Sequence, residues 1–102
     1  MFVSYTDTSG IRIRNNSTDN LVTNCSISFT GRTESNNGEA VYIGASSQFW
    51  AARGPDRSSR NSVAYNYIGP YVLSESVDIK EGVDNVIVEH KYMNIKHNNY
   101  VI

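Results

Sequence analysis

The feature that most constrains this chain is a short strand-like pattern that occurs four times. The copies occupy residues 10–14, 39–44, 75–80 and 100–102. Apolar residues stand two positions apart in each copy, which is the spacing of side chains on one face of a β-strand. The isoleucines of the four copies are Ile13, Ile43, Ile79 and Ile102. Strand patterns that return in a fixed order predict a solenoid, with these isoleucines stacked in one interior column.

A second pattern follows each of the first three copies, in residues 22–27, 63–68 and 87–92. Its leading aliphatic residues are Val22, Val63 and Ile87, which we expect to form a second interior column. Two short strands per coil are therefore predicted. The longer coils contain extra polar, glycine-bearing segments at residues 29–38 and 45–60, which we expect to be loops.

Inside the second pattern, the third position after the leading residue is Cys25, then Asn66, then His90. We expect this column to lie where the chain turns inward and to satisfy the amides of the turns from coil to coil. Cys25 is the only cysteine, so the chain has no internal disulfide, and its place in an alternating strand predicts a small buried residue.

The paired patterns resemble the repeats of the pectin-lyase-like superfamily, above all residues 39–44 with 61–68 and residues 75–82 with 85–90. The resemblance covers residues 9–102 and implies an all-β fold, a right-handed parallel β-helix of three to four coils. Residues 1–102 would then be a single β-helix domain or a partial domain, because this number of coils is small and neither end shows a convincing cap. The superfamily includes polysaccharide lyases, glycoside hydrolases, phage tailspikes and adhesins, so the resemblance does not fix an activity.

Composition excludes several partners. The net charge is -1 and no face rich in lysine and arginine stands out, so we expect no nucleic-acid partner. No segment approaches the length that crosses a bilayer, so no membrane partner is expected. No signal peptide is visible, but the resemblance implies an extracellular protein.

Alternation also predicts which side chains of the first pattern face outward. If Val41 and Ile43 point inward, Tyr42 points outward, and the outward residues of the other copies are Arg12, Arg14, Asp78 and Lys80. The resemblance implies that a sugar polymer lies across this kind of sheet. Lyase chemistry needs a cation for the substrate carboxylate and a base for the neighbouring proton, and this patch supplies such residue types. The alternative is that these charges only solvate an exposed strand.

The 45–60 loop carries Trp50, Arg53 and Arg57. A tryptophan face can support a sugar ring, and an arginine can bind an acidic group, so we expect this loop to overhang the patch. The alternative is that Phe49 and Trp50 fold back over the side of the solenoid.

Glu39 and Glu75 each stand two residues before a patterned valine, so they should stack on adjacent coils as a candidate acid pair. They are candidate acid and base partners, Ca²⁺ ligands or turn residues that bind backbone amides. Asp56, Asp78 and Glu81 offer further oxygen ligands, yet no dense aspartate spacing indicates a metal site. No cofactor is therefore expected, with Ca²⁺ left as an option, and no catalytic residue is assigned.

The sequence thus predicts an extracellular carbohydrate-associated module that binds or acts on a polysaccharide through the outward patch and the 45–60 loop. Whether it is an enzyme is left open; a lyase or glycoside hydrolase type is expected if it is one. The alternative function is a structural module that assembles end to end with copies of itself, because open coil edges at Tyr100 to Ile102 and at the Met1 end could pair with another chain.

Overall fold

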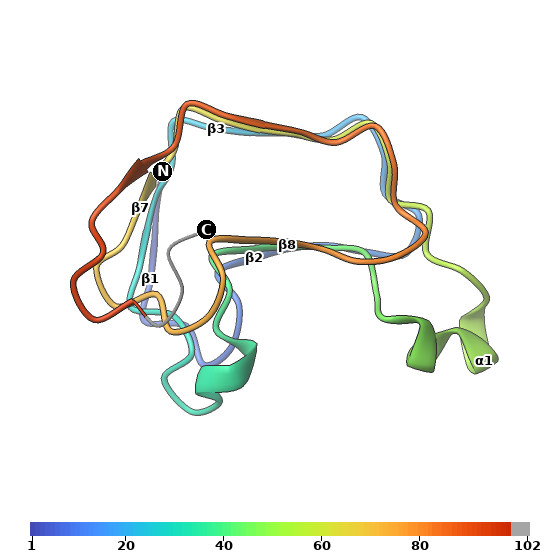
Figure 1. Ribbon diagram of the computed structural model, residues 1–102, viewed down its shortest axis with the longest axis horizontal. Coiled ribbons are helices and arrows are strands. Elements are labelled where there is room, and N and C mark those ends of the chain that lie inside the picture. The colour runs from blue at the N-terminus through green and yellow to red at the C-terminus, as the bar shows by residue number, and fades with distance from the viewer. Residues whose placement is uncertain (99–102) are drawn as a thin grey trace.

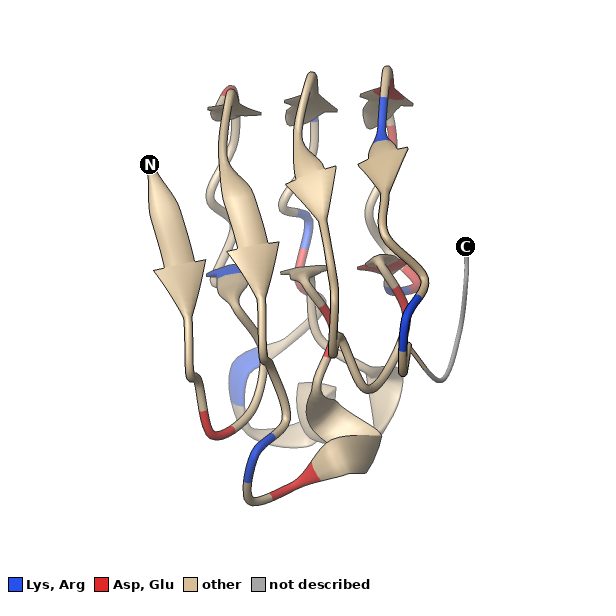
Figure 2. Cartoon of the chain, turned by 90° about the vertical axis from the view of Figure 1, so that its left-hand side faces the viewer, with Lys and Arg blue, Asp and Glu red and all other residues tan. Residues whose placement is uncertain are grey.

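The chain folds into a short parallel β-helix in the computed structural model, which describes residues 1–98 (Figure 1). Its strands form three parallel sheets, and each full coil contributes one strand to each sheet. Seen along the solenoid, the successive coils superimpose, and two loops project from the common outline (Figure 1). Figure 2 shows the same strands from the side, stacked as successive rungs. The predicted solenoid fold is confirmed.

The three sheets are named by their first strands. The β1 sheet contains β1 (Phe2–Ser4), β4 (Ser26–Ser28), β7 (Tyr67–Ile68) and β10 (Tyr92–Met93). The β2 sheet contains β2 (Ile11–Ile13), β5 (Val41–Ile43) and β8 (Val77–Ile79). The β3 sheet contains β3 (Leu21–Thr23), β6 (Ser62–Ala64) and β9 (Ile87–Glu89).

The first interior column is confirmed in the β2 sheet. Ile13 pairs with Ile43, and Ile43 pairs with Ile79, in parallel register. Ile43 is fully buried between its neighbours, whereas Ile79 on the last described rung of this sheet is 43% exposed. The predicted fourth member, Ile102, lies outside the described residues.

The second column is correct for two members and wrong for the third. Val22 pairs with Val63, but Val63 pairs with Val88, and Ile87 pairs with Ser62. Ile87 consequently points outward and is 54% exposed. Three aliphatic residues stand in a row at positions 86–88, so period-2 alternation fits two registers, and a shift of one residue exchanges the two faces of a strand.

The prediction of two strands per coil is also incomplete, because the second pattern is two strands separated by a corner. The corner residues Asn24, Tyr65 and His90 have positive φ angles of 54°, 59° and 52°, which end the alternation at the same point in each coil. His90 therefore belongs to the column of corner residues. The prediction that it satisfies turn amides in one column with Cys25 and Asn66 is wrong. Its ring stacks on that of Tyr65, with the ring centroids 4.4 Å apart.

Asn66 does satisfy the turn above it, as predicted. Its buried Oδ1 accepts the backbone N–H of Cys25 at 2.9 Å, and its Nδ2 donates to the carbonyl of Val22 at 2.9 Å. Cys25 is buried, as expected. A second buried asparagine, Asn61, bridges the preceding corner in the same way, where its Oδ1 accepts the N–H of Asn20 at 2.9 Å.

Both predicted insertions leave the solenoid as loops with short helical turns. The first contains η1 (Ser35–Asn37), and the second contains η2 (Ser47–Phe49) followed by α1 (Trp50–Arg53). Within residues 1–98, the structure has no helix with the length and apolar character needed to cross a membrane.

We expect Asn66→Ala to lower the free energy of unfolding by about 2–4 kcal/mol, because it leaves a buried N–H and a buried carbonyl without partners. Chemical denaturation monitored by circular dichroism would measure the loss. Asn36→Ala removes an exposed asparagine from η1 and should change stability by about 0.5 kcal/mol or less. Equal effects of the two substitutions would show that the buried bridge does not stabilise the coils.

Candidate functional site

The outward face of the β2 sheet brings the predicted patch together. Arg12 pairs with Tyr42, and Tyr42 pairs with Asp78, so the three side chains form one column across three coils. The Arg12 guanidinium carbon and the Lys80 Nζ each lie 5.4 Å from the centroid of the Tyr42 ring. A half-buried phenol thus lies between two cations, which both interact with the ring face.

Lys80 is also ion-paired. Its Nζ lies 3.0 Å from Oδ2 of Asp78. The hydrogen bond to Asp78 raises the pKa of Lys80 above its ordinary value, although partial burial of the ammonium opposes the shift. Lys80 is therefore a fixed positive charge on this face at neutral pH.

Three carboxylates meet beside the cations. Oxygens of Glu39, Glu75 and Asp78 all lie within 4.8 Å of one another. Glu39 is only 3% exposed and accepts a hydrogen bond from Ser9 Oγ at 2.9 Å. The predicted acid pair does stack on adjacent coils, and the structure adds Asp78 to it.

The carboxyl group of Glu75 has a raised pKa in this cluster. Burial raises the pKa of its carboxyl group, and the negative charges of Asp78 and Glu39 raise it further. A bound proton or a bound cation would relieve the repulsion between these carboxylates. Glu81, named above as a further oxygen ligand, instead accepts a hydrogen bond from Ser47 Oγ at 3.3 Å.

A groove runs over this face between the two loops. It consists of two hollows of about 420 and 280 Å³, and both are lined by Asn37, Tyr42 and Phe49. Phe49 is 56% exposed at the end of η2, so it is the aromatic residue of the 45–60 loop that overhangs the patch. The alternative expected from the sequence treated Phe49 and Trp50 alike, with both folded back over the solenoid. The exposed position of Phe49 over the groove is known only from the structure.

Trp50 turns the other way, as the fold-back alternative predicts. Its Nε1 donates to the carbonyl of Ala45 at 3.0 Å, and its ring packs against Gly82 on the next coil, where an added Cβ would lie 2.9 Å from it. The expectation that Trp50 overhangs Tyr42 is therefore wrong, because its indole lies under the loop and against the solenoid.

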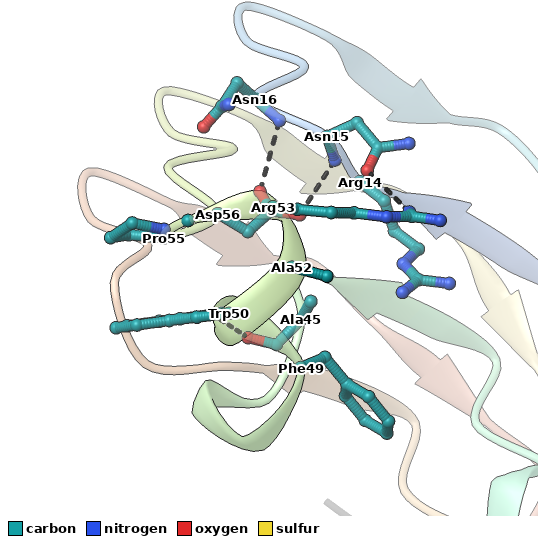
Figure 3. Close-up of a pocket in the computed structure, with 11 residues that line it drawn as sticks. Arg14, Asn15, Asn16, Ala45, Phe49, Trp50, Ala52, Arg53, Pro55 and Asp56 are labelled. Atoms are coloured by element: carbon teal, nitrogen blue, oxygen red, sulfur yellow. Dashed lines mark hydrogen bonds between the residues drawn. The ribbon is translucent and has the colours of Figure 1, made fainter.

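The arginines of the 45–60 region lie apart from the groove floor. Arg57 donates from Nη1 to the carbonyl of Gly82 at 3.4 Å, which directs its side chain toward the next coil. Arg53 donates from Nη1 to Oδ1 of Asn15 at 3.3 Å. Arg53 lines a separate pocket together with Arg14 and Trp50 (Figure 3). The carboxylate of Asp56 accepts hydrogen bonds from backbone N–H groups of the turn after β2.

Among solved structures, this chain is similar to an alginate lyase from Paenibacillus sp. str. FPU-7, with 33% sequence identity and a TM-score of 0.90. The match covers 95% of this chain and 32% of the lyase, so the chain spans about a third of the lyase's length. No family model matches the chain, and no match was found among curated proteins. The two proteins share a β-helix fold, while membership of the pectin-lyase-like superfamily stays a prediction.

The acid cluster predicts a pH-dependent effect of Glu75→Gln on stability. The folded-state pKa of Glu75 is raised, so the ionised carboxylate destabilises the fold, and this cost is absent below about pH 4.5, the ordinary value for a glutamate. We expect the substitution to stabilise the protein at pH 7 by about 0.5 kcal/mol, the order of a like-charge contact between neighbouring strands.

Thermal unfolding of both proteins between pH 4 and pH 8 would measure this difference. The gain should shrink as the pH falls toward 4. Glu89→Gln, which removes an exposed glutamate from β9, serves as the matched control. A gain that is constant with pH would contradict the assigned repulsion.

Proposed function

We propose that this chain forms the substrate-binding face of a polysaccharide lyase and binds an acidic polysaccharide along the groove over the β2 sheet. The observation that carries the proposal is the position of Tyr42 on the groove floor between the cations of Arg12 and Lys80. The similarity to an alginate lyase supports the choice of polymer, because alginate is a chain of uronic acids.

Arg12 is the residue proposed to bind the substrate carboxylate. It is exposed on the first strand of the face, and its Nε contacts Ser9 Oγ at 3.3 Å, which orients the planar guanidinium. A guanidinium pairs with a carboxylate through two parallel hydrogen bonds. This pairing would neutralise the uronate and make the proton on the adjacent carbon easier to remove.

The proposed reaction is β-elimination. The C–H bond next to the carboxylate breaks, a carbon–carbon double bond forms, and the glycosidic C–O bond at the next carbon breaks. A base takes the first proton, and the leaving oxygen receives a proton. Tyr42 is the proposed proton-transfer group, since it stands on the middle strand and its neighbouring cations stabilise the negative charge that develops in the transition state.

A glycoside hydrolase mechanism receives less support. Such enzymes use two carboxyl groups that reach the sugar from opposite sides of the bond. Glu39 is almost fully buried and hydrogen-bonded to Ser9, and it lies on the same side as Glu75 and Asp78. These carboxylates fit better as a group that supports the groove. If Ca²⁺ takes part, Glu39, Glu75 and Asp78 would hold it, and it would supply positive charge for the substrate carboxylate.

Location and assembly stay predictions. An extracellular location accords with a polysaccharide substrate. The end-to-end assembly alternative depended on open coil edges at both ends. Tyr100 to Ile102 lie outside the described residues, while β1 is an edge strand of its sheet and its Phe2 is 87% exposed. Assembly through this edge stays a prediction.

Two substitutions of Tyr42 separate binding from cleavage. Tyr42→Phe keeps the ring and removes the hydroxyl, so alginate oligosaccharides should bind within about threefold of the wild-type affinity, while the elimination rate should fall by about 10²–10⁴-fold. Tyr42→Ala should lose the cleavage in the same way and should also weaken binding by about 2- to 13-fold, since ring contacts contribute about 0.5–1.5 kcal/mol to binding. Calorimetry measures the affinity, and the ultraviolet absorbance of the new double bond measures the rate.

Tyr67→Ala, an exposed tyrosine of the β1 sheet, is the matched control and should behave as wild type. Full activity in Tyr42→Phe would exclude proton transfer by the phenol. Wild-type protein that binds no alginate oligosaccharide, with or without added Ca²⁺, would refute the proposed function.

A further inference from the structure

A second pocket adjoins the groove where the chain leaves β2. It measures about 390 Å³ and lies between residues 14–16 and the segment 45–56 (Figure 3). This volume is within the range of about 300–1,000 Å³ that is typical of sites for small molecules. Arg14 and Phe49 line both this pocket and the groove, so the two spaces are direct neighbours.

The pocket has two arginines on one side. Arg14 comes from the turn after β2 and Arg53 from α1, and Figure 3 shows both side chains above Phe49. The Nε of Arg14 is buried and has no hydrogen-bond partner within residues 1–98. Arg53 makes a 3.3 Å contact with the neutral amide of Asn15. The buried Nε of Arg14 is costly without a partner, and neither guanidinium is ion-paired with a carboxylate within residues 1–98, so the two cations favour an anionic ligand.

Asp56, the carboxylate that lines this pocket, is engaged with the backbone. Its oxygens accept the N–H groups of Asn15 at 2.8 Å and Asn16 at 3.2 Å, and also bind Ser58. Although burial opposes it, the hydrogen bonds from Ser58, Asn15 and Asn16 lower the pKa of Asp56. Asp56 therefore stays ionised and holds the turn that presents Arg14. Its hydrogen bonds go to this turn and to Ser58, and not to the two guanidinium groups.

Apart from Asn15 and Asn16, the rest of the lining is apolar or aromatic, and it includes Phe49, Trp50, Ala52 and Pro55. Aromatic faces pack against the C–H faces of sugar rings, while cations bind their acidic groups. From this lining and the shared residues Arg14 and Phe49 at the groove, we infer that this pocket is a subsite for one further uronic acid unit of the polysaccharide. Arg14 and Arg53 bind its carboxylate, and the aromatic side chains contact its ring. The inference rests on the proposed function, since it places a neighbouring unit of the same polymer.

Trp50 makes the pocket directly observable, because it is the only tryptophan in the chain and lines this space. The experiment titrates the protein with an alginate trisaccharide, with the neutral trisaccharide maltotriose and with glucuronate alone. Trp50 fluorescence, read immediately after mixing, reports the pocket, and calorimetry reports total binding. We expect a saturable fluorescence change with the trisaccharide of alginate and none with maltotriose.

Two variants of α1 test the assignment, and both positions are exposed outside the solenoid core, so folding should be retained. Arg53→Gln should weaken trisaccharide binding about tenfold, the loss expected for one charge-assisted contact. Ala52→Phe should fill the pocket and abolish the fluorescence change. Arg32→Gln removes the same charge from the other loop and should match wild type.

The outcomes separate the subsite from the groove. If Tyr42→Ala weakens trisaccharide binding while Arg53→Gln and Ala52→Phe bind as wild type, the groove stands and the subsite is overturned. If no alginate binding is found but glucuronate changes Trp50 fluorescence in an Arg53-dependent way, the proposed function fails and the pocket stands as a site for an acidic sugar. The absence of both responses overturns both.

Discussion

The structure depends on the in-register pairing of parallel strands from coil to coil. Each strand of the β2 sheet meets the same position of the next coil, at the spacing of about 4.8 Å that backbone hydrogen bonds impose. Residues that are 30 and 36 positions apart in the sequence, such as Arg12, Tyr42 and Asp78, thereby become direct neighbours. The same constraint fills the interior with aliphatic columns and places chemically different groups in outward columns. The residues of a functional surface on such a fold come from successive coils and not from one continuous segment of the chain.

This constraint explains why unlike charges and like charges lie close together here. Cations at Arg12 and Lys80 flank the Tyr42 ring, while three carboxylates gather at the neighbouring end of the same face. The two groups are joined through the ion pair between Lys80 and Asp78. The raised pKa of Glu75 results from the enforced proximity of the carboxylates as well as from burial.

Much of the fold could be predicted from the sequence because it follows from period-2 alternation and a regular repeat. The columns of Ile13 and Ile43 and of Val22 and Val63 were predicted from spacing alone. The error at Ile87 arose where three successive aliphatic residues made the alternation ambiguous, and the register was then set by the positive-φ corner at His90. The third sheet was missed because a corner of a single residue leaves no signal in the alternation of side chains.

The site could be predicted in part. The outward residues on regular strands, Tyr42 and its neighbours, follow from alternation, and so does the stacking of Glu39 on Glu75. The existence of the 45–60 loop was predicted, but its course could not be, because it is fixed by contacts with distant residues. Trp50 folds back onto Gly82, and Phe49 is left over the groove. The pocket of Arg14 and Arg53 likewise depends on a turn held by Asp56, which is 41 residues from Asn15 in the chain.

The central claim is that an acidic polysaccharide binds along the β2 face, and nuclear magnetic resonance mapping with an alginate oligosaccharide tests it most directly. The account predicts that the largest chemical-shift changes fall on β2, β5 and β8 and on the segment around Phe49, with the β1 and β3 sheets unaffected. Changes confined to the β1 or β3 sheet, or no changes at saturating ligand, would contradict it.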